Sequence, residues 1–146
     1  MSLHNQLIRA TDIAIEVHTG QYDKNNQPYI NHVIRVSSAG QTIQEKIVGA
    51  LHDVVEDSNL TIDNLKEEGF DAEILDAVHT MTHYETETYD EYIDKIILNP
   101  LAARVKINDL TDNMDLRRLD VLDGETIMRV KKYFAAYKKI INSFIH

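Results

Sequence analysis

The segment Ala50-Leu-His-Asp-Val-Val-Glu-Asp57 places four ionisable side chains within an apolar helical pattern. Residues four positions apart lie on one face of a helix, so we expect His52 to lie over Glu56 and Asp53 over Asp57. Burial of such groups is costly unless they are paired or bound to a metal, and neighbouring carboxylates repel one another. A divalent cation removes both costs and lowers the pKa of a bound water. Taken alone, the segment is more typical of a water-facing helix surface, and a hydrolytic metal site is the alternative.

Two further segments offer side chains that would complete such a site. Pro28-Tyr-Ile-Asn-His32 places a histidine after a rigid turn at a helix start, and Lys106-Ile-Asn-Asp109 places an aspartate in a helix rich in apolar residues. Each residue alone is more typical of a structural or surface role. Together with His52 and Asp53 they form a set of two histidines and two aspartates. Because the chain has no cysteine, any metal would be held by such a set, which suits manganese, iron, magnesium or zinc.

The elements that must position these residues are all predicted to be helices. Only 5 glycines and 2 prolines interrupt the 146 residues, and no stretch alternates polar and apolar residues as a strand does. Apolar spacing and capping patterns predict a first helix ended by Gly20, then helices over about 31–40, 42–57, 61–69, 71–81, 88–99, 101–113 and 124 to the C-terminus. We therefore expect an all-α single domain over residues 1–146, with His52 to Asp57 on one central helix.

Composition and charge limit the classes of partner. The formal net charge of −9 argues against nucleic acid, because such binding needs a broad basic surface. No apolar run is long enough to span a membrane, and Met1 to Arg9 lacks the apolar stretch of a signal peptide. We therefore expect no membrane partner and a cytoplasmic location, while the oligomeric state stays open. An acidic protein that binds a phosphorylated ligand must offset the local repulsion with a metal and a few placed lysines or arginines.

Four motifs follow one another along the chain: His18-Thr-Gly-Gln21, Pro28-Tyr-Ile-Asn-His32, His52-Asp-Val-Val-Glu-Asp57 and Lys106-Ile-Asn-Asp-Leu-Thr-Asp-Asn113. Their order resembles the hydrolase domain of RelA/SpoT-type alarmone enzymes, and the stand-alone small alarmone hydrolases are closest in length. The resemblance covers nearly the whole chain. It implies a helical bundle of the HD phosphohydrolase type around one divalent metal, usually manganese. It also implies a small nucleotide substrate, a guanosine tetra- or pentaphosphate, from which pyrophosphate is released at the 3′ position.

The resemblance assigns an expected role to each site residue. The family's metal ligands correspond to His32, His52, Asp53 and Asp109. Its carboxylates that position or activate the attacking water correspond to Glu56 and Asp57. Its substrate-contacting side chains correspond to Lys24, Asn113, Arg129 and Tyr133. The last two lie one turn apart on the last predicted helix, where a surface arginine and a half-buried core tyrosine are an alternative interpretation.

Four positions depart from the family pattern. The family often has arginine where this chain has Asp23, Leu110 and Asp115, and lysine where it has His83. These changes weaken the expected attraction for phosphates. Two alternatives therefore stay open: an HD-type phosphohydrolase that acts on another nucleotide or a phosphorylated cofactor, and a non-catalytic sensor that binds a nucleotide or a partner helix. The retained Glu-Asp pair of the third motif argues against the sensor, because a protein that only binds needs no water-activating carboxylates.

Overall fold

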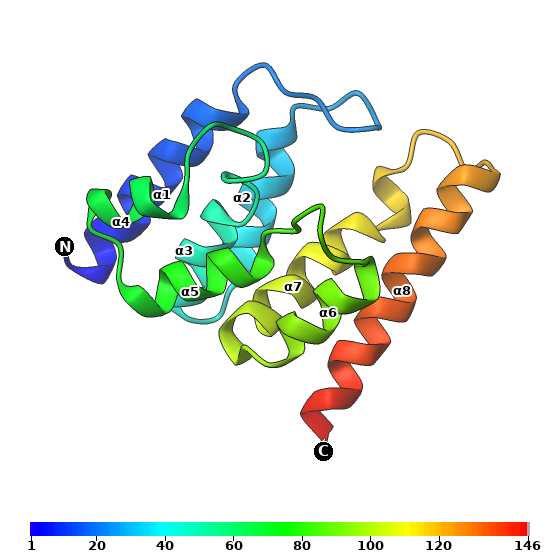
Figure 1. The fold of residues 1–146 in the computed structure, drawn as a ribbon. Coiled ribbons are helices and arrows are strands. Elements are labelled where there is room, and N and C mark those ends of the chain that lie inside the picture. The colour runs from blue at the N-terminus through cyan, green and yellow to red at the C-terminus, as the bar shows by residue number, and fades with distance from the viewer. Residues whose placement is uncertain (146) are drawn as a thin grey trace.

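The computed structural model describes residues 1–145, and within this range the regular elements are helices, with no strand (Figure 1). Eight are α-helices and one is a short 3₁₀ helix, η1. Their bounds are α1 Leu3–His18, α2 Tyr29–Ala39, α3 Ile43–Leu51, α4 Ile62–Glu68, α5 Ala72–Met81, α6 Tyr89–Ile97, α7 Pro100–Asn113, η1 Leu116–Arg118 and α8 Gly124–Ile145. The predicted all-α fold is confirmed, while position 146 of the expected domain lies outside the described residues. None of the described helices is both long and apolar enough to cross a membrane.

Local capping interactions set most helix boundaries where the sequence predicted them. Thr61 and Thr88 each form a capping box, in which the hydroxyl accepts an N–H from the first turn and the threonine N–H donates back to a side chain there. Asn99 caps α7 directly before Pro100. Gly69 ends α4 with a φ of 103°, a left-handed conformation that glycine adopts without the steric cost of a Cβ atom.

The helix predicted over His52 to Asp57 is wrong, because α3 ends at Leu51 and the motif continues as a series of turns. The carbonyl of Gly49 accepts a hydrogen bond from Nδ1 of His52 at 2.6 Å. In a regular helix, that carbonyl would accept the backbone N–H of Asp53, four residues further along the chain. The side chain of His52 thus competes with the backbone for this carbonyl, at the point where the regular helix ends.

The core surrounds α3, which contacts α1, α2, α5 and α7. Ile47, Val48 and Leu51 of α3 are fully buried. Among the described elements, α8 contacts only α6 and α7, where Ala136 and Ile140 join the core. Figure 1 shows α8 along the outer side of α7, far from α1. The fold therefore places α2, the turns after α3, and α7 next to one another, with α8 beside them.

Truncation of Ile47 to alanine should destabilise the protein strongly, because this side chain is fully buried at the centre of the core. Removal of a buried isoleucine typically costs about 2–5 kcal/mol of unfolding free energy. Ile8 of α1 is 50% exposed and provides a matched control, since Ile8→Ala should change stability by only about 0.5 kcal/mol. Urea unfolding followed by circular dichroism measures both, and equal losses would contradict the assigned core.

Candidate metal centre and active site

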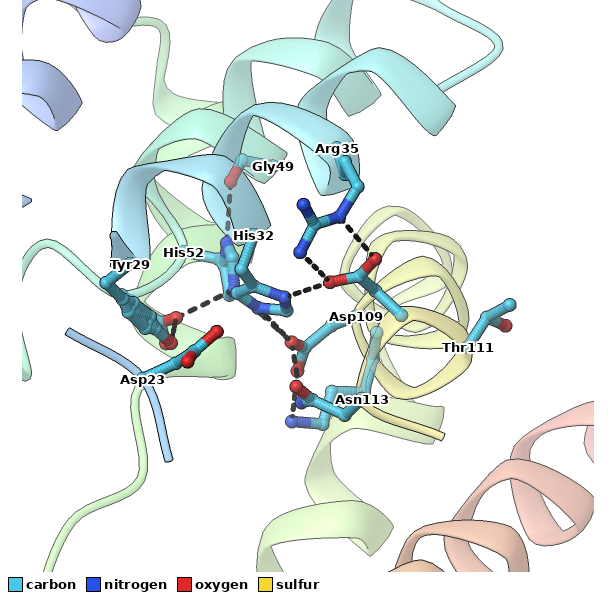
Figure 2. A network of polar contacts seen from close by, with 12 residues as sticks. Asp23, Tyr29, His32, Arg35, Gly49, His52, Asp109, Thr111 and Asn113 are labelled. Atoms are coloured by element: carbon cyan, nitrogen blue, oxygen red, sulfur yellow. Dashed lines mark hydrogen bonds and ion pairs between the residues drawn. The ribbon is translucent and has the colours of Figure 1, made fainter. Parts of the chain in front are cut away.

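Two histidines and one aspartate from three separate elements meet at a buried point (Figure 2). His32 comes from α2, His52 directly follows α3, and Asp109 comes from α7. One potential ligand atom of each lies within 4.8 Å of the others. Oδ1 of Asp109 is 2.9 Å from Nε2 of His32 and 3.5 Å from Nε2 of His52. The fold thus brings three of the four predicted metal ligands together.

Asp53, the fourth predicted ligand, lies beside this cluster but outside that group of three. Its Oδ2 is 3.0 Å from Nε2 of His52 and accepts a hydrogen bond from the hydroxyl of Tyr29. Burial opposes the charge of Asp53, but the adjacent His52 imidazole lowers the pKa of this carboxyl group to about 2. Its role as a ligand stays a prediction.

The hydrogen bonds of both imidazoles leave the same ring nitrogen free. Nδ1 of His32 donates to Oδ2 of Asp112 at 2.6 Å, and Nδ1 of His52 donates to the carbonyl of Gly49. In both rings Nε2 is buried and makes no hydrogen bond among the described residues. Nε2 of His32 faces a carboxylate oxygen at 2.9 Å and Nε2 of His52 faces one at 3.0 Å, but with the proton on Nδ1 both atoms of each contact are acceptors. Buried polar atoms nearly always have partners, and metal-bound histidines usually donate their other N–H to a carboxylate or carbonyl. This donor set therefore fits a divalent cation.

Asp112 orients His32 and was missed in the sequence. Its carboxylate accepts a hydrogen bond from Nε of Arg35 at 2.7 Å, besides that from His32, and forms an ion pair with Arg118 at 2.8 Å. Burial opposes the charge, but the hydrogen bonds from His32 and Arg35 lower the pKa of Asp112 to about 2. The available signal was its spacing, since Asp112 follows Asp109 by three residues and shares its face of α7.

Lys106 and Asn113 both donate hydrogen bonds to the carboxylate of Asp109. Nζ of Lys106 donates to Oδ2 of Asp109 at 2.8 Å, and Nδ2 of Asn113 donates to Oδ1 at 3.2 Å. Lys106 is only 8% exposed. Burial opposes its charge, but Asp109 raises the pKa of this lysine well above its usual value. Lys106 begins the fourth sequence motif, and the structure makes it the counter-ion of a candidate ligand.

Glu56 and Asp57 are held next to the cluster by polar contacts. The backbone N–H of His83 donates to Oε1 of Glu56, and Nε2 of Gln21 donates to Oδ2 of Asp57 at 3.1 Å. Partial burial, reinforced by the nearby charge of Asp53, raises the pKa of both carboxyl groups. The site therefore concentrates negative charge that a bound cation would offset.

Two clefts adjoin the cluster and share Tyr29, Asn113 and Tyr133 as common walls. The larger cleft has a volume of about 300 Å³ and also contacts His32. The smaller cleft has a volume of about 200 Å³ and is lined by Asp53 and Asp109 of the candidate metal centre. The four predicted substrate residues all line the larger cleft, and they are Lys24, Asn113, Arg129 and Tyr133.

Asp23 lines the larger cleft, but its charge is not free to repel a phosphate. Its Oδ2 accepts a hydrogen bond from Nη2 of Arg118 at 3.1 Å. Its Oδ1 accepts the backbone N–H groups of Asn25 and Gln27, both at 2.9 Å. Asp23 therefore organises the loop that carries Lys24 and is neutralised by an arginine that the sequence analysis did not identify.

The other departures from the family pattern also have defined environments. Leu110 is fully buried in the core and lines neither cleft. Asp115 lines the larger cleft but caps η1 and pairs with Arg117 at 2.7 Å. His83 lines the smaller cleft, where its ring stacks on Tyr92 with centroids 4.6 Å apart. The loss of attraction for phosphates is therefore smaller than the sequence alone suggested.

Comparison with known proteins finds relatives named guanosine-3′,5′-bis(diphosphate) 3′-pyrophosphohydrolases and others named GTP pyrophosphokinases. No family model matches the chain. The guanosine-3′,5′-bis(diphosphate) 3′-pyrophosphohydrolase of Haemophilus influenzae is 31% identical over 134 residues, which cover 82% of this chain and 20% of that protein. The enzyme of the same name from Drosophila melanogaster is 28% identical over 132 residues, which cover 83% of this chain and 73% of that protein. The chain thus spans about a fifth of the long bacterial relative and most of the shorter insect one.

A solved structure shares the fold. It is described as a metazoan ortholog of SpoT that hydrolyzes ppGpp, and it superposes with a TM-score of 0.74 at 24% sequence identity. The match covers 94% of this chain and 84% of the other chain. The arrangement of helices around the candidate metal centre is therefore one that a known protein also adopts.

Proposed function

Because the chain resembles guanosine-3′,5′-bis(diphosphate) 3′-pyrophosphohydrolases in sequence and has the all-helical fold of a metazoan SpoT ortholog, we propose that it hydrolyses the 3′-diphosphate of a guanosine alarmone. Water adds to the phosphorus attached to the 3′ oxygen, and the bond between this phosphorus and the 3′ oxygen breaks. The 3′ oxygen takes up a proton, so the products are pyrophosphate and GDP or GTP. The observation that carries the proposal is the buried cluster with two unpartnered imidazole nitrogens, directly beside a cleft with cationic walls.

The chain's own residues have separate tasks in this proposal. His32, His52, Asp53 and Asp109 hold one divalent metal, with Mn²⁺ the expected ion. When bound, such a metal polarises a phosphoryl group and acidifies water. Glu56 and Asp57 orient the attacking water and accept its proton.

The larger cleft binds the nucleotide in this proposal. Lys24 and Arg129 attract its phosphates, while Tyr133 and Asn113 contact the substrate at the wall shared by the two clefts. Charge-assisted contacts of this kind are stronger than neutral hydrogen bonds. Because Asp23 and Asp115 are paired with arginines, they leave the charge of Lys24 available.

The test is a comparison of kcat/KM for three compounds with manganese-loaded protein: the alarmone, GTP and a 3′-phosphorylated cofactor. We expect the alarmone to be the preferred substrate, with pyrophosphate as a product. The second candidate, a phosphohydrolase acting on another phosphate ester, is favoured by Asp115 and His83, where the family pattern has basic residues. Turnover of another ester without turnover of the alarmone would establish that candidate. Binding without any turnover would indicate a sensor.

The wider setting is also part of the proposal. Residues 1–146 form one HD-type domain that acts on a small nucleotide in the cytoplasm, without nucleic acid or a membrane as partner. The acidic net charge of −9 supports this choice of partner.

A further inference from the structure

Aromatic rings hold two lysine ammonium groups at the smaller cleft. Nζ of Lys106 lies 5.0 Å from the ring centroid of Tyr92, and Nζ of Lys132 lies 4.1 Å from that of Tyr89 and 6.0 Å from that of Tyr133. The face of an aromatic ring attracts a cation through its quadrupole and carries no opposite charge. Lys106 also pairs with Asp109, whereas the contacts of Lys132 position its ammonium group and leave its charge available to an anion.

Unlike most cationic side chains of the two clefts, Lys132 has no carboxylate partner among the described residues. Arg118, Arg129 and Lys106 each have a carboxylate partner. Lys24 in the larger cleft and Lys132 in the smaller cleft have none within 4.0 Å in the part of the chain that the structure describes. Each cleft thus presents one lysine whose charge no carboxylate neutralises.

The two clefts also differ in size and in the character of their walls. Sites for drug-sized molecules typically have volumes of about 300–1,000 Å³. The larger cleft, at about 300 Å³, reaches this range and includes the aliphatic side chains of Leu119 and Val130. The smaller cleft, at about 200 Å³, is lined by polar and aromatic residues alone. A nucleoside therefore suits the larger cleft, and a compact anion suits the smaller one.

We propose that the smaller cleft is a diphosphate subsite, in which Lys132 pairs with the terminal phosphate of the group that is hydrolysed. This proposal rests on the proposed function and divides its substrate between the clefts. Asp53 and Asp109 line the smaller cleft and His32 lines the larger one, so the candidate metal centre lies where a 3′-linked diphosphate passes from one to the other. Glu56 also lines the smaller cleft, and Lys132 offsets its repulsion of the phosphate.

Titration calorimetry with methylenediphosphonate, a diphosphate that cannot be hydrolysed, tests the subsite directly. The full chain is used with Mn²⁺ in excess over protein and ligand. Lys132→Met should weaken diphosphonate binding about 10- to 100-fold, as expected for loss of a charged hydrogen bond, and Lys132→Arg should restore most of it. Binding of GDP should change little in Lys132→Met and should weaken in Lys24→Met.

Lys131→Met is the matched control, because Lys131 is the exposed neighbour on α8 and lines neither cleft. An equal loss of diphosphonate binding in Lys131→Met, or unchanged binding in Lys132→Met, would overturn the subsite. If the alarmone is turned over while Lys132→Met leaves the affinity for the diphosphonate unchanged, the subsite is wrong and the proposed function stands. If the alarmone is not turned over while diphosphonate binding depends on Lys132, the subsite stands and the proposed function is wrong.

Discussion

Replacement of His52 or Asp109 by alanine should abolish both stoichiometric metal binding and turnover. Each variant removes one potential ligand atom from a buried cluster that is already assembled by the fold. The remaining donors cannot complete the site, because no cysteine and no further histidine of the described residues joins the group. Metal content by mass spectrometry and initial rates of pyrophosphate release measure the two effects.

Two further variants make this result specific. His4→Ala removes an exposed histidine of α1 and should keep both metal and activity. Asp112→Asn keeps the cluster but weakens the partner of His32, and loss of such a partner typically lowers metal affinity about 10- to 100-fold. Circular dichroism shows whether each variant remains helical. Undiminished metal content in both His52→Ala and Asp109→Ala would refute the assigned centre.

Substitution of Glu56 by glutamine or Asp57 by asparagine should retain the metal and slow turnover by about 10²–10⁴-fold, the usual contribution of general acid–base catalysis. Both changes keep the shape of the side chain and remove its capacity to accept a proton. Neither residue belongs to the buried three-residue group. Turnover numbers at saturating alarmone, together with metal content, separate this effect from loss of the cation.

Glu67→Gln, at an exposed position of α4, is the control for a neutralised carboxylate and should turn over substrate normally. Near wild-type rates in both Glu56→Gln and Asp57→Asn would remove the pair from the mechanism. Loss of metal in either variant would instead make that residue a ligand.

The helix boundaries that could be predicted are those fixed by neighbouring residues. Thr61, Thr88 and Gly69 act within one turn of the helix that they cap, so the sequence carries the whole signal. The end of α3 was mispredicted because it depends on a side chain, His52, that takes the carbonyl of Gly49 from the backbone. The apolar periodicity continues through Val54 and therefore gives no sign that the His52 side chain replaces a backbone N–H at this carbonyl.

The candidate ligands could be selected from motifs, but their supporting contacts could not. Asp112 and Lys106 lie on the same helix as Asp109, at spacings equally compatible with contact with water. The bond between Asp23 and Arg118 joins positions 95 residues apart. Such a pairing depends on where the loop after α1 meets η1, which only the folded chain defines.

The attachment of α8 has a consequence for the proposed choice of substrate. Among the described elements α8 contacts only α6 and α7, yet Arg129, Lys132 and Tyr133 on it line the two clefts. The cluster of imidazoles and carboxylates is built from α2, the turns after α3, and α7. Under the proposed function, mutations on one peripheral helix therefore alter which phosphate ester binds, while the candidate metal centre stays unchanged.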